Sequence, residues 1–188
     1  MKIAEIEHTP NPNAMKFVLK EPITQGFSTR SFEMPEDAVN VPLARQIFDI
    51  DHVISVYFAD RWITVTQDGG AAWPELMRAI AAPIREATVE DANPDIGSAV
   101  AGDDGKAERP GLDDPRIPMI EEVLEYHIMP FLAGDGGGLQ IAGLVDDQLM
   151  IRYEGACGTC PASISGTLLA IENLLQVEVD PNLTVVAI

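Results

Sequence analysis

The sequence predicts an α+β protein made of two small α/β-sandwich domains joined by a flexible linker. Short alternating apolar segments, typical of half-buried strands, are interspersed with apolar residues at helical spacing. A central segment shows neither period. The chain has 188 residues and is 46% hydrophobic, which is enough for two packed cores near the lower size limit of independent domains. We therefore expect domains at 1–88 and 114–188.

The central segment covers residues 89–113 and reads VEDANPDIGSAVAGDDGKAERPGLD. It is rich in Asp, Gly, Ala and Pro and contains no aromatic residue. This composition is typical of a linker, because it offers neither a face to bury nor a repeating hydrogen-bond pattern. We expect it to be flexible and acidic.

The first block predicts the order β-β-α-β-β-α. Pro42 favours the start of a helix, since its missing N–H is not needed there. Pro83, inside the last apolar-periodic segment, predicts a kink or an early end of that helix. The expected elements are strands at 2–7, 15–19, 53–58 and 62–66 and helices at 42–48 and 73–87, with a rigid turn at 9–13.

The second block predicts the order α-β-β-α-β. Its first helix carries Ile117, Ile120, Val123, Leu124, Ile128 and Phe131 at helical spacing. Asp113 or Asp114 could cap it. A glycine-rich break at 134–138 ends this helix. Strands follow at 139–141 and 149–153, then a helix at 161–175 and a third strand at 184–187.

The net charge of −18 disfavours nucleic acid as a partner, because such a field repels phosphate backbones. No apolar run approaches 20 residues, so we expect no membrane span. The N-terminal residues alternate and are acidic, unlike a signal or transit peptide. We expect a cytoplasmic protein whose thiols stay reduced.

The two cysteines, Cys157 and Cys160, form a C-x-x-C loop between a predicted strand and a predicted helix. Its glycines and other small residues favour a tight turn, sulfurs left uncovered and amide N–H groups that face them. One such loop supplies half of a four-thiolate site. The spacing alone leaves four interpretations: an iron–sulfur cluster, a dithiol redox site, half of a shared zinc site, or inert thiols.

The other polar candidates favour structural roles. His127 lies on an apolar helix and is expected to be a partly buried packing residue, while His8 and His52 are expected at the surface. Asp135 lies between glycines and is expected to bond its own turn. No catalytic triad, phosphate loop or carboxylate pair can be placed.

Several motifs in sequence order carry a resemblance to a known family. The second block resembles the NifU-like C-terminal domain of Nfu-type iron–sulfur cluster proteins, and the first resembles their N-terminal domain. The motifs of the second block are Ile128-Met129-Pro130-Phe131-Leu132, Gly134-Asp135-Gly136-Gly137 and Gly155-Ala156-Cys157-Gly158-Thr159-Cys160-Pro161. Those of the first are Thr9-Pro10-Asn11-Pro12-Asn13-Ala14-Met15-Lys16-Phe17, Pro42-Leu43-Ala44 and Trp62-Ile63-Thr64-Val65-Thr66.

The resemblance implies a cluster scaffold or carrier, not an enzyme, in which Cys157 and Cys160 are the ligands. Two chains would form a homodimer around one bridging [4Fe-4S] cluster, although four thiolates would serve a [2Fe-2S] cluster equally well. The cluster would be built in place or received from an upstream scaffold, and passed to apo-proteins. The first domain would dock partners. Gly138 stands where the family often has an acidic residue, and Gly158-Thr159 replaces its usual Ser-Gly spacer. The alternative remains a thiol–disulfide oxidoreductase.

Overall fold

The computed structural model describes residues 1–24, 29–94, 110–158 and 161–188, with the backbone alone at 161–165. The chain divides into two compact units, Met1–Gly102 and Asp103–Ile188, each with its own sheet. The predicted α+β class is confirmed. Most of the predicted linker, residues 95–109, lies outside the described residues. In the part of the chain that the structure describes, no helix is long and apolar enough to cross a membrane.

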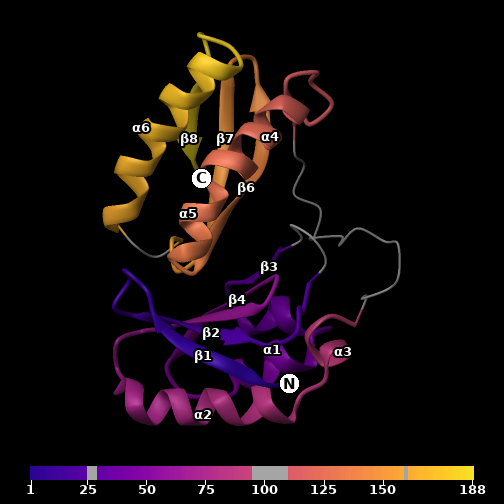
Figure 1. The fold of residues 1–188 in the computed structure, drawn as a ribbon, viewed down its shortest axis with the longest axis vertical. Helices are drawn as coiled ribbons and strands as arrows, with labels where there is room; N and C mark the ends of the chain where they lie inside the picture. The colour runs from indigo at the N-terminus through magenta and orange to yellow at the C-terminus, as the bar shows by residue number, and fades with distance from the viewer. Residues whose placement is uncertain (25–28, 95–109, 159–160) are drawn as a thin grey trace. The chain divides into compact units, whose positions relative to one another are not determined.

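The N-terminal unit is a five-stranded antiparallel sheet in the order β1-β2-β5-β4-β3, with helices α1 and α2 packed on one face (Figure 1). Its strands are β1 (Ile3–His8), β2 (Ala14–Leu19), β3 (Thr29–Phe32), β4 (Val53–Ala59) and β5 (Trp62–Gln67). Its helices are η1 (Pro35–Ala38), α1 (Pro42–Phe48), α2 (Trp73–Glu86) and α3 (Val89–Ala92).

Two of these elements correct the predicted order. The edge strand β3 was missed, since its four residues are too few to show a period and Arg30 interrupts the apolar pattern. Helix α3 lies where the linker was expected to begin. Thr88 Oγ1 accepts from the Asp91 backbone N–H, and the Asp91 carboxylate accepts from the Thr88 N–H. This capping box fixes the helix, and Ala92 is fully buried in the core.

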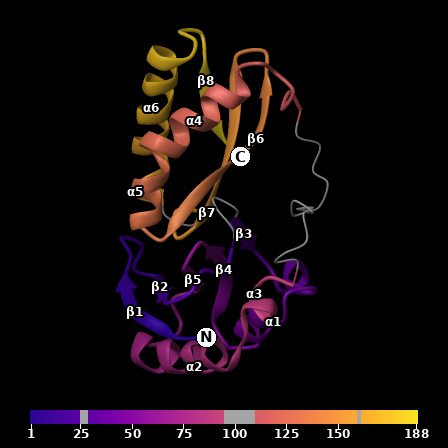
Figure 2. The same cartoon turned by 45° about the vertical axis from the view of Figure 1, so that its right-hand side comes forward.

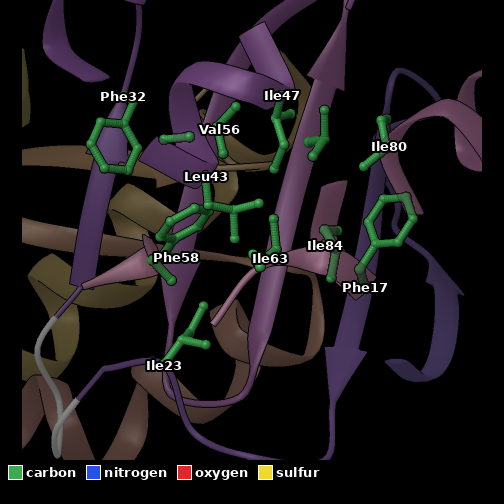
Figure 3. Packing of buried hydrophobic residues seen from close by; sticks show 14 of the residues in the cluster. Phe17, Ile23, Phe32, Leu43, Ile47, Val56, Phe58, Ile63, Ile80 and Ile84 are labelled. Atoms are coloured by element: carbon green, nitrogen blue, oxygen red, sulfur yellow. The ribbon is translucent and has the colours of Figure 1, made fainter. Parts of the chain in front are cut away.

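The core of the N-terminal unit fills the space between the sheet and its helices. Figure 3 shows side chains from the strands and helices converging on one another, among them Phe17, Phe58, Ile63, Leu43 and Ile80. Burial of Leu76, Ile80 and Ile84 carries α2 through Pro83 as far as Glu86, so the early end predicted at that proline is wrong. An amphipathic face therefore outweighs one lost backbone hydrogen bond.

The C-terminal unit packs three helices against one face of a three-stranded sheet (Figures 1 and 2). The sheet order is β6-β7-β8; β6 and β7 are antiparallel, whereas β8 runs parallel to β7. The elements are α4 (Ile117–His127), α5 (Met129–Gly134), β6 (Gly137–Val145), β7 (Gln148–Gly155), α6 (Pro161–Glu178) and β8 (Thr184–Ala187). All three predicted strands of this unit are present.

The single helix predicted through Phe131 is instead two helices that meet at Ile128. Pro130 explains the break, because proline disfavours helical geometry in the preceding residue and is favoured in the first turn of a new helix. This break leaves Phe131 exposed and directs α5 toward the glycine-rich segment that follows.

The predicted cap of α4 is also wrong: the N-cap residue is Arg116, with no side-chain cap. Asp114 accepts from the Arg116 backbone N–H and guanidinium. The guanidinium also reaches Asp147 in the β6–β7 turn at 2.9 Å and Asp180 after α6 at 3.4 Å. These bonds to Arg116 lower the pKa of Asp114, and the Asn182 backbone N–H, together with Arg116, lowers that of Asp180. One arginine thus joins three segments.

Candidate functional site

Two glycine-rich turns meet at one end of the β6–β7 hairpin. Gly137 pairs with Gly155 in the sheet, and the Ala156 backbone N–H donates to the Gly136 carbonyl at 3.3 Å. Gly136 has a φ of 77° and Gly155 a φ of 62°, values that favour glycine. The chain that leaves α5 and the chain that enters the cysteine loop are therefore fixed against each other by backbone contacts.

Cys157 lies on Gly137. A Cβ atom added to Gly137 would stand 2.6 Å from Cys157 Sγ, 2.7 Å from the Glu154 carbonyl oxygen and 2.9 Å from the Cys157 backbone nitrogen. No side chain fits in that space. The glycine is thus required by the sulfur and the loop backbone, and this contact gives the Gly-Gly segment a physical link to the cysteine motif.

One expectation about the loop is wrong. Cys157 is only 2% exposed and belongs to the packed core of the C-terminal unit, so its sulfur is not uncovered. Gly155 and Ala156 are buried together with Cys157, whereas Gly158 is exposed. The backbone N–H groups of Ala156 and Gly158 donate to the carbonyls of Gly136 and Gly155. That other loop amides face the sulfurs stays a prediction, since residues 159–160 lie outside the described residues.

Cys160 lies outside the described residues, so its predicted place beside Cys157 stays a prediction. Helix α6 starts at Pro161, directly after the motif, and the positive end of a helix dipole stabilises nearby thiolates. Within the described ranges, no three His, Cys, Asp or Glu side chains gather as a metal site. A metal centre at Cys157 therefore requires further ligands from outside the described residues, of which Cys160 is the predicted one.

The remaining candidates do not join this site. His127, expected to be partly buried, is exposed and its ring packs edge-on against Tyr126. His8 and His52 are at the surface, as predicted. Asp135 is half-buried at the C-terminal end of α5.

Tyr153 is a neighbour of Cys157 that the sequence analysis missed. It lies on β7, is 7% exposed, and packs in the same core cluster as Cys157. Burial raises the pKa of Tyr153 to about 12, and the adjacent Cys157 thiolate adds to that rise. The alternation Leu149, Ile151, Tyr153 along β7 was the available signal, since it places this ring on the buried face just before the loop.

Two family models together match most of the chain. Residues 3–91 match the model described as "Scaffold protein Nfu/NifU N terminal", and residues 120–186 match the "NifU-like domain". These ranges correspond to the two compact units of the structure.

Curated relatives match this chain over 92% of its length. One is the "NFU1 iron-sulfur cluster scaffold homolog, mitochondrial" of Homo sapiens, 34% identical and matched over 66% of its length. Another is "NifU-like protein 4, mitochondrial" of Arabidopsis thaliana, 30% identical and matched over 61% of its length. The chain thus spans somewhat less than two thirds of these relatives.

Among solved structures, protein SAV1430 of Staphylococcus aureus is 26% identical, with a TM-score of 0.40 over 45% of this chain and 99% of that one. Because the two domain models match in order, and a curated scaffold homologue aligns across both, this chain belongs to the Nfu family of iron–sulfur cluster scaffold proteins.

Proposed function

We propose that this chain carries an iron–sulfur cluster that it receives or assembles and then passes to apo-proteins. The proposal rests on the close contact between Cys157 Sγ and Gly137. This contact lies at a C-x-x-C motif within a NifU-like domain. Cys157 and Cys160 are the proposed ligands. The cluster is the cargo of this protein, and the chain itself performs no catalytic step.

The donor set fits a cluster only when two chains combine. Each chain has two cysteines, whereas an iron–sulfur cluster takes about four thiolates. We therefore propose a homodimer in which both C-x-x-C loops hold one bridging [4Fe-4S] cluster. A [2Fe-2S] cluster would use the same four sulfurs.

Transfer is proposed to occur by ligand exchange. Thiolates of a recipient protein attack the irons one after another, and each new Fe–S bond replaces one to Cys157 or Cys160. Because Cys157 is buried, cluster loading requires its sulfur to become accessible.

The N-terminal unit is proposed to dock the recipient or an upstream scaffold. It contains no cysteine, so it cannot supply a thiolate ligand. Holding a recipient on the same chain raises the effective concentration of its thiolates near the cluster. Both thiols must stay reduced, so we place the activity in a reducing compartment such as the cytoplasm.

Single substitutions at the two cysteines test the ligand assignment. After anaerobic reconstitution with iron and sulfide, the wild-type chain should acquire a coloured cluster, and Cys157→Ala and Cys160→Ala should each acquire none while keeping the fold. A cluster retained by either variant contradicts the assignment. A metal-free wild-type protein that reduces disulfides, with no cluster formed, would favour the dithiol oxidoreductase instead.

A further inference from the structure

The Tyr153 hydroxyl is an unpaired donor at the edge of the site. Its oxygen is buried, and among the described residues no group meets the geometry of a hydrogen bond to it. Thr167 of α6 lies beside the hydroxyl and lowers the pKa slightly, although the two do not meet that geometry. A buried hydroxyl without a partner is unfavourable, and this one is retained beside the cysteine loop.

The Cys157 sulfur is a possible hydrogen-bond acceptor for this hydroxyl. Tyr153 and Cys157 pack in the same core cluster, and Tyr153 lies on β7 just before the cysteine loop. Gly137, on the paired strand, contacts the same sulfur. A thiolate that binds iron keeps lone pairs that accept hydrogen bonds, and donors around a cluster tune its potential and stability.

We propose that Tyr153 is a positioning residue that donates a hydrogen bond to the Cys157 sulfur when that sulfur holds the cluster. The proposal rests on the proposed function and adds a role for a residue outside the C-x-x-C motif. The donor lies on strand β7, in the same core cluster as the sulfur.

The bond should affect the cluster in two measurable ways. A donor stabilises the more negative, reduced form, so its presence raises the reduction potential. It also strengthens the hold of Cys157 on iron, and partners of this kind change metal affinity by about 10-fold or more. Both effects depend on one oxygen atom rather than on the packing of the ring.

The test compares Tyr153→Phe with the wild-type full-length chain after reconstitution. Tyr153→Phe removes the hydroxyl and keeps the ring. We expect a lower reduction potential, roughly 10-fold faster loss of iron to a chelator, and an unchanged or higher melting temperature, because an unpaired buried hydroxyl is gone. Tyr126→Phe, whose ring is 78% exposed on α4, is the matched control and should behave as the wild type.

A second variant separates the hydroxyl from packing. Tyr153→Leu should match Tyr153→Phe in potential and iron loss if the hydroxyl matters. Wild-type values in Tyr153→Phe, with altered values in Tyr153→Leu alone, would overturn the proposal. If the wild-type chain forms no cluster, the proposed function fails. Cadmium alone then tests the donor, since a lower Cd²⁺ affinity in Tyr153→Phe supports it and an equal affinity rejects it.

Discussion

The two units of this chain differ in the types of side chain that make up their cores. The core cluster of the N-terminal unit contains only hydrocarbon and thioether side chains, converging from a five-stranded sheet and its helices (Figure 3). The core of the C-terminal unit reaches the end of a smaller sheet and there includes Cys157 and Tyr153. The core cluster of the first unit is thus entirely apolar, whereas the second unit places the sulfur of Cys157, a proposed cluster ligand, in its own core.

This contrast links stability and function differently in the two units. A loss of packing in the C-terminal unit should reach the cysteine loop directly, because Cys157 is one of the packed residues. A similar loss in the N-terminal unit should leave the ligands in place. The following predictions test this difference, from the largest expected effect to the smallest.

Matched core truncations give the largest effect. Leu149→Ala in β7 and Ile63→Ala in β5 each remove a fully buried side chain, and each should cost about 2–5 kcal/mol in its own unit. Hydrogen exchange resolved by peptide should show the loss confined to that unit. Only Leu149→Ala should lower the amount of cluster bound. Equal cluster loss in both variants would contradict separate units.

Gly137→Ala should displace the cysteine loop, because its added methyl group would overlap Cys157 Sγ and the loop backbone. We expect a cost of about 1–3 kcal/mol and a large loss of cluster occupancy after reconstitution. Gly134→Ala is the control, since a Cβ there meets no atom within 4 Å. A wild-type amount of bound cluster in Gly137→Ala would show that cluster binding does not depend on the close contact between Gly137 and Cys157 Sγ.

The Arg116 network predicts how acid affects the C-terminal unit. The pKa values of Asp114 and Asp180 are lowered in the folded chain, so their stabilising contribution is present above about pH 4 and is lost as pH falls through the lower folded values. Arg116→Leu should lower the melting temperature at pH 7 and weaken this acid dependence. Melting curves between pH 7 and pH 3 would measure both; an unchanged pH profile would contradict the prediction.

The smallest effect is expected at the cap of α3. Thr88→Ala removes the acceptor for the Asp91 backbone N–H and should cost about 1 kcal/mol of N-terminal stability. Cluster binding should not change. Denaturant unfolding of the variant measures the first expectation, and reconstitution the second; a drop in bound cluster would show that the units are coupled.

Strong local patterns were sufficient to predict most of the fold. Alternation predicted the strands of both units, and Pro42 predicted the start of α1. Short elements were missed because they depend on tertiary contacts: β3 is held by pairing with β4, and α3 by its capping box and the burial of Ala92. At Ile128 and Pro83, propensity and packing compete, and the sequence does not show which prevails.

The site was predicted only at the level of its motif. Spacing identified Cys157, but its burial was missed, because small neighbours permit close packing as readily as exposure. The seat on Gly137 and the approach of Tyr153 arise from strand register and the folded core, since Gly137 pairs with Gly155 across the hairpin. The contact at Gly137 has no signature in a single sequence, and the alternation along β7 indicates only that Tyr153 lies on the buried face.

The most direct test of the central claim is native mass spectrometry of the anaerobically reconstituted chain, with iron and sulfide measured on the same sample. The account predicts a dimer with about two irons and two sulfides per chain, as expected for one shared [4Fe-4S] cluster, and only metal-free protein for Cys157→Ala. A colourless monomer without iron, or a cluster retained by Cys157→Ala, would contradict it.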